Sequence, residues 1–178
     1  MTAYGNQLTR LNQRRVLGPL AGTPVFYHAT EHLLPRLPVP TVLTVHDLIF
    51  ERYPAHHTWR NVQFLKRAMP AFVRAADVVI AVSEHTKRDL VELYATPPAK
   101  IRVVHEGVDA HFAPASPDAV AAVRARYGLT RSYLLMVGTL EPRKNHLTAM
   151  AALARLKAAG QDVTLAVAGG HGWRFEPV

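Results

Sequence analysis

The chain has 178 residues, no cysteine, and 21 Lys and Arg residues against 13 Asp and Glu residues. This length is close to one average domain of roughly 150 residues, and the hydrophobic content of 49% with 19% charged residues excludes a largely disordered chain. The lack of cysteine excludes disulfides and thiolate metal sites, and the net charge of +8 favours an anionic partner.

No targeting or membrane-spanning segment is visible in the sequence. The first 25 residues lack the apolar core of a signal peptide, and no apolar run approaches the length of about 18 residues that crosses a bilayer. We therefore expect a cytoplasmic protein, with peripheral contact at the inner membrane face as a further option that the basic charge leaves open.

Six short apolar runs predict β-strands. They are rich in Val, Ile, Leu and aromatic residues, and their apolar residues run continuously, which is typical of parallel strands covered on both faces. The predicted strands are Pro24–His28, Thr41–His46, Asp77–Val82, Ile101–Val104, Tyr133–Val137 and Val163–Ala168.

Four helical patterns lie between the strands. Their boundaries follow from capping residues and glycine stops, and Pro70 is expected to kink or end the first of them. The helices are predicted over Trp59–Ala76, Ser83–Tyr94, Ser116 to about Tyr127, and Asn145–Ala159. The alternation of strands and helices predicts a doubly wound, Rossmann-like α/β fold with parallel sheets.

The polar segment His105–Pro117 predicts a division of the chain into residues 1–112 and residues 113–178. Four predicted strands precede this segment and only two follow it, and two strands with two helices are too few to close a core. We expect the second part to expose a sheet edge that promotes self-association. Alternatively, its two strands join the first four in a single sheet.

The segment YLLMVGTLEPRKN, residues 133–145, predicts an anion-binding loop. A buried strand ends at Gly138, the loop carries Arg143 and Lys144, and a helix begins at about Asn145. Free N–H groups at the helix start and two cations suit a phosphate, and Gly138 allows a close approach of the backbone. A solvated loop with two surface cations is the alternative, because many such loops bind nothing.

His46 and Asp47 fall where an apolar strand stops, at the carboxyl edge of the sheet, where α/β proteins bind ligands. The imidazole can donate, accept or polarise near neutral pH, whereas the alternative is a pair that satisfies local turn amides. Two other loops follow predicted strands and are weaker candidates, the first for the same edge of the sheet and the second equally for a flexible turn. One carries Glu106, and the other carries Gly169 and Gly170, which permit close backbone approach to a ligand.

Several classes of enzyme lack their motifs here. His28–His32 matches the zinc pattern H-x-x-E-H, but prolines at 35, 38 and 40 and the β-rich residues before it exclude the required helix. The P-loop, G-x-G-x-x-G and G-x-S-x-G motifs are absent. No two aspartates are separated by one residue, so we expect no metal cofactor and a phosphate charge met by Arg, Lys and helix dipoles.

The segments HDLIFERYP, ADVVIAVSEHTKRDL, KIRVVHEGVD and VGTLEPRKNH, in this order, resemble the middle of a retaining GT-B glycosyltransferase of family four. The resemblance covers nearly all of His28–Trp173 and implies two Rossmann-like domains that face each other across a cleft. In that family the nucleotide-sugar donor sits mainly on the C-terminal domain and the acceptor on the N-terminal domain. The chain would hold part of each domain.

The resemblance also implies roles for individual residues. The donor diphosphate would be bound by the loop that contains Gly138, Thr139, Arg143 and Lys144. His46 would contact the donor sugar near the acceptor, and Asp47 would orient the imidazole or the neighbouring turn. The cleft would further be lined by Ser83, Glu84, Lys87, Glu106, Gly169 and Gly170.

The sequence departs from the family at three places. Thr139 stands where many members have an arginine, the glycine-rich loop has no counterpart in Met1–Gly22, and the E-x7-E donor segment would lie after Val178. We therefore expect the isolated chain to have little transferase activity.

The expected function is the retaining, metal-independent transfer of a hexose, with mannose as the leading candidate, from a nucleotide sugar to a glycan or a lipid-linked acceptor. The alternative is a non-catalytic basic module that binds nucleic acid or an anionic membrane through Trp59–Arg74. In the transferase interpretation no nucleic acid partner is expected.

Overall fold

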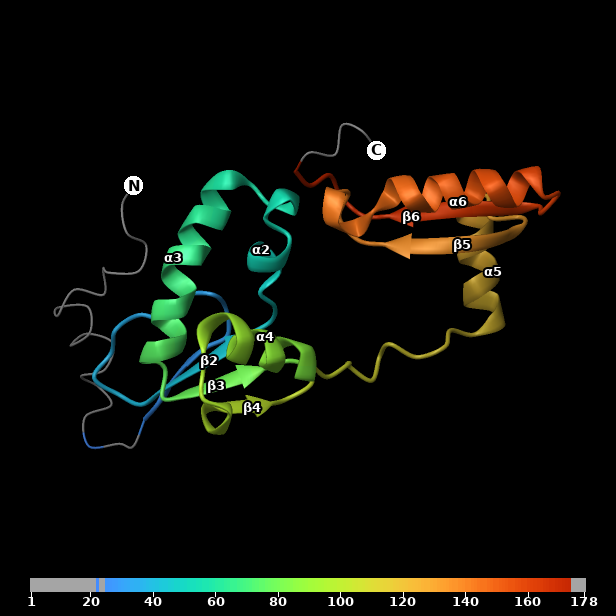
Figure 1. Ribbon diagram of the computed structural model, residues 1–178. Helices are drawn as coiled ribbons and strands as arrows, with labels where there is room; N and C mark the ends of the chain where they lie inside the picture. Colours follow the sequence, from blue (N-terminus) through green and yellow to red (C-terminus); the bar gives the residue numbers. More distant parts are fainter. Residues whose placement is uncertain (1–21, 23–24, 174–178) are drawn as a thin grey trace. The chain divides into compact units, whose positions relative to one another are not determined.

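The computed structural model describes residue 22 and residues 25–173 and divides the chain into two compact units (Figure 1). Unit 1 is Met1–Gly107 and unit 2 is Val108–Val178. The division falls in residues 104–116, which form neither helix nor strand. The expectations for Pro24 and for residues 1–21 concern positions outside the described residues.

Unit 1 is built on four parallel strands in the order β1-β2-β3-β4. All four strands predicted for this region are present. The second, third and fourth each lack one or more of the predicted end residues, whereas the first begins at Tyr27 and extends one residue further than predicted, to Ala29. The strands are β1 (Tyr27–Ala29), β2 (Thr41–Val45), β3 (Val78–Ala81) and β4 (Ile101–Val103).

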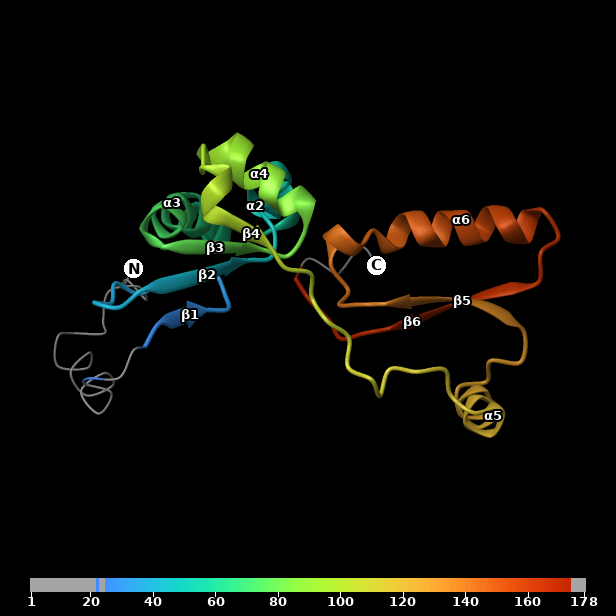
Figure 2. The same cartoon turned by 90° about the horizontal axis from the view of Figure 1, so that it is seen from below.

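The helices of unit 1 lie on one face of this sheet (Figure 2). They are α2 (Ile49–Arg52), α3 (Trp59–Ala75) and α4 (Glu84–Tyr94). Successive strands are also spatial neighbours, so crossovers of the same hand place α3 and α4 on the same side. The core under these helices includes Leu43, Val79 and Ile101, whereas His28 and Arg102 on the opposite face are exposed. The expected helical cover on both faces is therefore wrong for the sheet of unit 1.

Local signals explain most of the helix boundaries in unit 1. The Ser83 hydroxyl accepts a hydrogen bond from the Thr86 N–H at 3.0 Å, which confirms it as the cap of α4. Helix α3 continues through Pro70 to Ala75, because buried Met69 and Val73 hold both sides of the proline in the core. Two short 3-10 helices that the sequence analysis missed, η2 (Pro54–His56) and η3 (Pro98–Lys100), both begin at a proline.

Unit 2 contains a separate two-stranded parallel sheet, which rules out a single six-stranded sheet. Helix α6 covers one face of this sheet and α5 lies on the other side (Figure 2). Its elements are α5 (Pro117–Arg126), β5 (Ser132–Val137), η4 (Pro142–Lys144), α6 (His146–Ala158) and β6 (Val163–Ala168). The Ser116 cap and the glycines after the two helices, at 128 and 160, are confirmed, both glycines having a positive φ.

The hydrophobic core of the described residues lies entirely in unit 1. Phe50, Leu43 and Met69 are at most 1% exposed, whereas Leu135 and Val137 on β5 are 60% and 72% exposed. The prediction that a buried strand precedes Gly138 is therefore wrong, because two strands and two helices are too few to enclose β5. No helix among the described residues is long and apolar enough to cross a membrane.

Candidate functional site

The carboxyl edge of the unit 1 sheet brings three loops together. His46 and Asp47 follow β2, the N-terminus of α4 follows β3, and Glu106 lies shortly after β4. In a parallel sheet all strands end at the same edge, so these side chains gather although they are far apart in the sequence.

His46 is held by two oxygen atoms on opposite sides of its ring. Its Nδ1 lies 3.0 Å from Oε1 of Glu106, and its Nε2 lies 2.9 Å from the carbonyl oxygen of Thr30. The Thr30 hydrogen bond is the largest cause that raises the pKa of His46 above its usual 6.5, with Glu106 and Glu31 adding to it and partial burial opposing it. The geometry thus favours a positively charged imidazole.

Asp47 contacts the neighbouring turn rather than the imidazole. Its Oδ1 accepts a hydrogen bond of 3.1 Å from the Ile49 N–H, at the start of α2. Of the two roles considered for Asp47, the structure shows the turn contact, and it places Glu106 against the His46 ring. The sequence analysis grouped Glu106 with the cleft residues but did not pair it with His46.

Ser83 reaches His46 through Thr86, a residue that the sequence analysis missed. Thr86 is 3% exposed, and its hydroxyl donates to the carbonyl oxygen of His46 at 3.0 Å. The Ser83 hydroxyl lies 2.9 Å from the Thr86 hydroxyl. Because the Thr86 hydroxyl has one hydrogen and donates it to the His46 carbonyl, the Ser83 hydroxyl is the donor in this second bond. This chain of hydrogen bonds fixes the backbone at His46 to the start of α4.

Glu84 and Lys87 lie on the first turns of α4 near the same edge. Glu84 is exposed and Lys87 is half-buried. Within residues 25–173, neither side chain has a hydrogen bond or an ion pair. Both side chains are therefore available to a ligand, in contrast to Ser83.

In unit 2 the loops after β5 and β6 pair with each other as backbone. The Gly138 N–H donates to Ala168 at 2.9 Å, and the Leu140 N–H donates to Gly170 at 2.9 Å. A Cβ on Gly169 would lie 1.9 Å from the Gly138 carbonyl oxygen, whereas one on Gly170 would meet nothing within 4 Å. The close approach at Gly169 is thus to neighbouring backbone.

Arg143 and Lys144 are the last two residues of η4, which is separated from the first residue of α6 by a single cap residue. The Arg143 Nη2 lies 2.7 Å from Oε1 of Glu141, a carboxylate that is 1% exposed. The Lys144 stem packs over Gly138, whose Cβ would lie 3.4 Å from the Lys144 Cε. Glu141, which the sequence analysis missed, therefore orients Arg143, and its position two residues before the arginine was the available signal.

The start of α6 differs from the expected capped end. Asn145 occupies the cap position with φ of 56° and makes no side-chain capping bond, whereas a capping residue usually has an extended backbone conformation. His146 follows at 2% exposure. Thr139 lies in the same loop, with its methyl group 2.6 Å from the position of a Cβ on Gly172. A long helix whose amino end adjoins two cations favours an anion.

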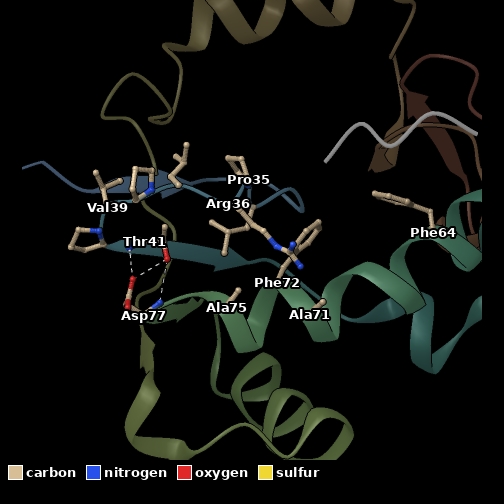
Figure 3. A pocket seen from close by; sticks show the side chains of 13 residues that line it. Pro35, Arg36, Val39, Thr41, Phe64, Ala71, Phe72, Ala75 and Asp77 are labelled. Carbon is tan, nitrogen blue, oxygen red and sulfur yellow. Dashed lines mark hydrogen bonds between the residues drawn. The ribbon is translucent and has the colours of Figure 1, made fainter. Parts of the chain in front are cut away.

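A pocket of about 640 Å³ lies at the other end of the unit 1 strands, between residues 34–40 and α3 (Figure 3). Asp77, one of its lining residues, accepts hydrogen bonds from the N–H and the hydroxyl of Thr41, at 2.7 Å and 3.0 Å. The Thr41 N–H is the largest cause that lowers the pKa of Asp77. None of the residues predicted for the functional site lines this pocket.

The described residues contain no cluster of three or more His, Asp or Glu side chains able to hold a metal ion. His28, the first residue of the H-x-x-E-H match, lies on strand β1 and not on a helix. Its Nε2 is 2.8 Å from the hydroxyl of Thr44.

Comparisons with known proteins point to one family. A profile of Glycosyltransferase Family 4 matches residues 21–112, just over half of the chain. The chain is 27% identical over 120 residues to the O-antigen chain mannosyltransferase B of Escherichia coli, a match of 67% of this chain and 32% of that protein. It is 34% identical over 114 residues to a GDP-mannose-dependent α-(1-6)-phosphatidylinositol monomannoside mannosyltransferase of Mycolicibacterium smegmatis, covering 63% and 29% of the two chains.

The fold also has counterparts among solved structures. Anabaena HepE, crystallised with UDP and glucose, superposes with a TM-score of 0.61 at 21% identity, over 78% of this chain and 35% of that one. The chain spans about a third of the length of the relatives described here. The likeness to HepE supports an α/β fold of GT-B type in both units.

Proposed function

The chain belongs to Glycosyltransferase Family 4, and from this premise we propose that it forms part of an enzyme that transfers a hexose from a nucleotide sugar to a glycan or a lipid-linked acceptor. The observation that carries the proposal is the pair of cations, Arg143 and Lys144, placed at the amino end of α6 in a family member. The relatives named for GDP-mannose and for UDP with glucose support a nucleotide-sugar donor, and two mannosyltransferase relatives favour mannose.

The proposed chemistry relies on fixed positive charge. During transfer with retention, negative charge builds up on the departing phosphate while the sugar acquires oxocarbenium character. Lys144 and the backbone N–H groups at the start of α6 then stabilise the transition state more than the ground state. Arg143 is oriented by buried Glu141, whose carboxylate offsets its charge, so Arg143 contributes N–H donors for the phosphate and Lys144 contributes the positive charge. We propose that these two side chains bind the diphosphate in place of a metal ion.

We assign His46 to the sugar end of the same reaction. Its hydrogen bonds to Glu106 and Thr30 leave a charged ring at the edge of the unit 1 sheet. Glu84 and Lys87 supply further polar side chains near that edge. We propose that the chain alone has little turnover, because it spans about a third of its relatives.

Binding of the donor tests the proposal without requiring turnover. Titration calorimetry with GDP-mannose and with UDP-glucose is expected to show binding to the chain and a loss of at least about tenfold in Lys144→Ala, consistent with one lost charge-assisted phosphate contact. Lys157→Ala is the matched control, because Lys157 is an exposed lysine in the last turn of the same helix. Equal affinities for the chain and for Lys144→Ala would contradict the proposal.

We also propose that α3 contacts an anionic membrane surface. Arg60, Arg67 and Arg74 recur every seven residues, so they follow one side of the helix about 10 Å apart. The helix contains no acidic residue, and Trp59 at its start is 70% exposed. Exposed arginines next to an exposed tryptophan match the headgroup region of a bilayer.

Vesicle co-sedimentation tests this contact. We expect the chain to bind vesicles that contain phosphatidylglycerol but not pure phosphatidylcholine, and to lose this binding in Arg67→Gln/Arg74→Gln. Arg124→Gln/Arg126→Gln on α5 removes the same charge elsewhere and is expected to retain it. Equal loss in the two double variants, or tighter binding to DNA than to vesicles, would contradict a membrane contact of α3.

We further propose that a second copy of the chain covers the open sheet of unit 2. Leu134, Leu135 and Val137 are 45% to 72% exposed along a strand that, among the described residues, pairs with one other strand. Sedimentation equilibrium is expected to show a mass that rises with concentration and to return towards the monomer in Leu135→Lys. A monomer at all concentrations would refute the self-association.

A further inference from the structure

Three strand ends of unit 1 meet around one imidazole ring. Thr30 follows β1, His46 follows β2, and Glu106 follows β4 after a short extension of the chain. The ring of His46 therefore bridges the first and the last strand of the sheet, with Nε2 at 2.9 Å from the Thr30 carbonyl oxygen and Nδ1 at 3.0 Å from the Glu106 carboxylate.

The two partners together determine the protonation of the ring. A backbone carbonyl only accepts hydrogen bonds, so Nε2 must carry a proton to make its contact. The Glu106 carboxylate also accepts, so Nδ1 must carry a proton as well. A neutral imidazole has one N–H and can make only one of these two contacts. The observed geometry is that of an imidazolium ion.

We propose that Glu106 is a positioning residue that fixes His46 as an imidazolium ion and holds its ring in place between the ends of β1 and β4. The inference rests on the proposed function in one respect, namely that His46 faces the donor sugar. With both N–H groups engaged, His46 supplies a fixed positive charge and cannot act as a general base. Glu106 would thus restrict His46 to electrostatic stabilisation of negative charge.

The other groups around His46 agree with this assignment. Glu31 contributes a favourable charge interaction that raises the pKa of His46, and partial burial opposes it. His32 packs edge-on against the ring with centroids 6.4 Å apart. From α4, Thr86 contacts only the His46 backbone, and Asp47 is turned to the start of α2. Glu106 is therefore the carboxylate whose oxygen reaches the ring.

Nuclear magnetic resonance of the full chain tests the pairing directly. Two-bond ¹H–¹⁵N spectra of the ¹⁵N-labelled protein report the protonation of each ring nitrogen from about pH 5 to about pH 9, the range in which histidine titrates. The signal of His46 is identified by its loss in His46→Gln. We expect its titration midpoint to lie above 6.5, and to fall in Glu106→Gln, which keeps the size of the side chain but removes its charge.

Asp109→Asn is the matched control, since it removes one carboxylate from the same loop. Asp109 contacts His111 rather than His46, so the midpoint of His46 is expected to stay within error of that of the unchanged chain. A His46 midpoint at or below 6.5, or one that Glu106→Gln leaves unchanged, would overturn the proposal. These outcomes do not depend on donor binding, whose failure would appear separately in the comparison with Lys144→Ala.

Discussion

Unit 1 and unit 2 are assembled from the same pieces but stabilised by different means. Both contain parallel strands joined by helices. Unit 1 buries Leu43, Met69 and Phe50 almost completely, whereas unit 2 has no buried hydrophobic side chain among its described residues. Its elements rely on local devices, such as the Ser116 cap and the turn at Gly128. Strand and helix patterns therefore predict elements equally well in both units, but a core forms only where enough strands and helices pack together.

A pair of leucine substitutions tests the difference in packing between the two units most strongly. Leu43→Ala removes a side chain with 0% exposure and is expected to lower the free energy of unfolding of unit 1 by about 2–5 kcal/mol. Leu135→Ala on β5, where the side chain is 60% exposed, is expected to change stability by less than about 0.5 kcal/mol. Denaturation in urea measures both. Similar losses in the two variants would show that unit 2 is packed like unit 1.

Substitutions at two neighbouring glycines test whether the backbone contact between the loops after β5 and β6 stabilises unit 2. In Gly169→Ala the new Cβ would clash with the Gly138 carbonyl, so we expect a loss of about 1–3 kcal/mol in the protection of β5 and β6 amides. Gly170→Ala meets open space and is the control. Native-state hydrogen exchange of the full chain measures the difference. Unchanged protection in Gly169→Ala would mean that the contact between the two loops does not stabilise β5 and β6.

The smallest expected effect is the pH dependence of unit 1 stability. The folded-state pKa of His46 is raised, so its stabilisation is fully present below its unfolded-state pKa and is lost as the pH rises through the folded-state value. The difference in unfolding free energy between the chain and Glu106→Gln should be about 0.2–1 kcal/mol near pH 6 and smaller near pH 9, as for other exposed ion pairs. A difference that grows with pH would have the wrong sign.

The sequence predicted the elements better than their environment. Ser83 and Ser116 marked helix starts correctly, because a cap is a local hydrogen bond. The exposure of β5 could not be read from its apolar residues, since they are equally compatible with a covered strand. The pairing of His46 with Glu106 joins residues 60 positions apart and depends on the order of the strands.

Similar reasons separate what was predicted from what was missed at the unit 2 loop. Gly138, Arg143 and Lys144 were predicted as site residues because a glycine and two cations between a strand and a helix form a recognisable local pattern. Glu141 was missed because a glutamate in a loop is usually exposed, whereas here it is buried against Arg143.

The central claim is that the loop between β5 and α6 holds the diphosphate of a sugar nucleotide. Amide chemical shifts of the full chain, recorded while GDP-mannose or UDP-glucose is added, test it most directly. We expect the largest changes at Gly138 and at residues 143–147, with Lys157 and the α5 amides unaffected. Changes confined to unit 1, or none at all with either sugar nucleotide, would contradict the claim.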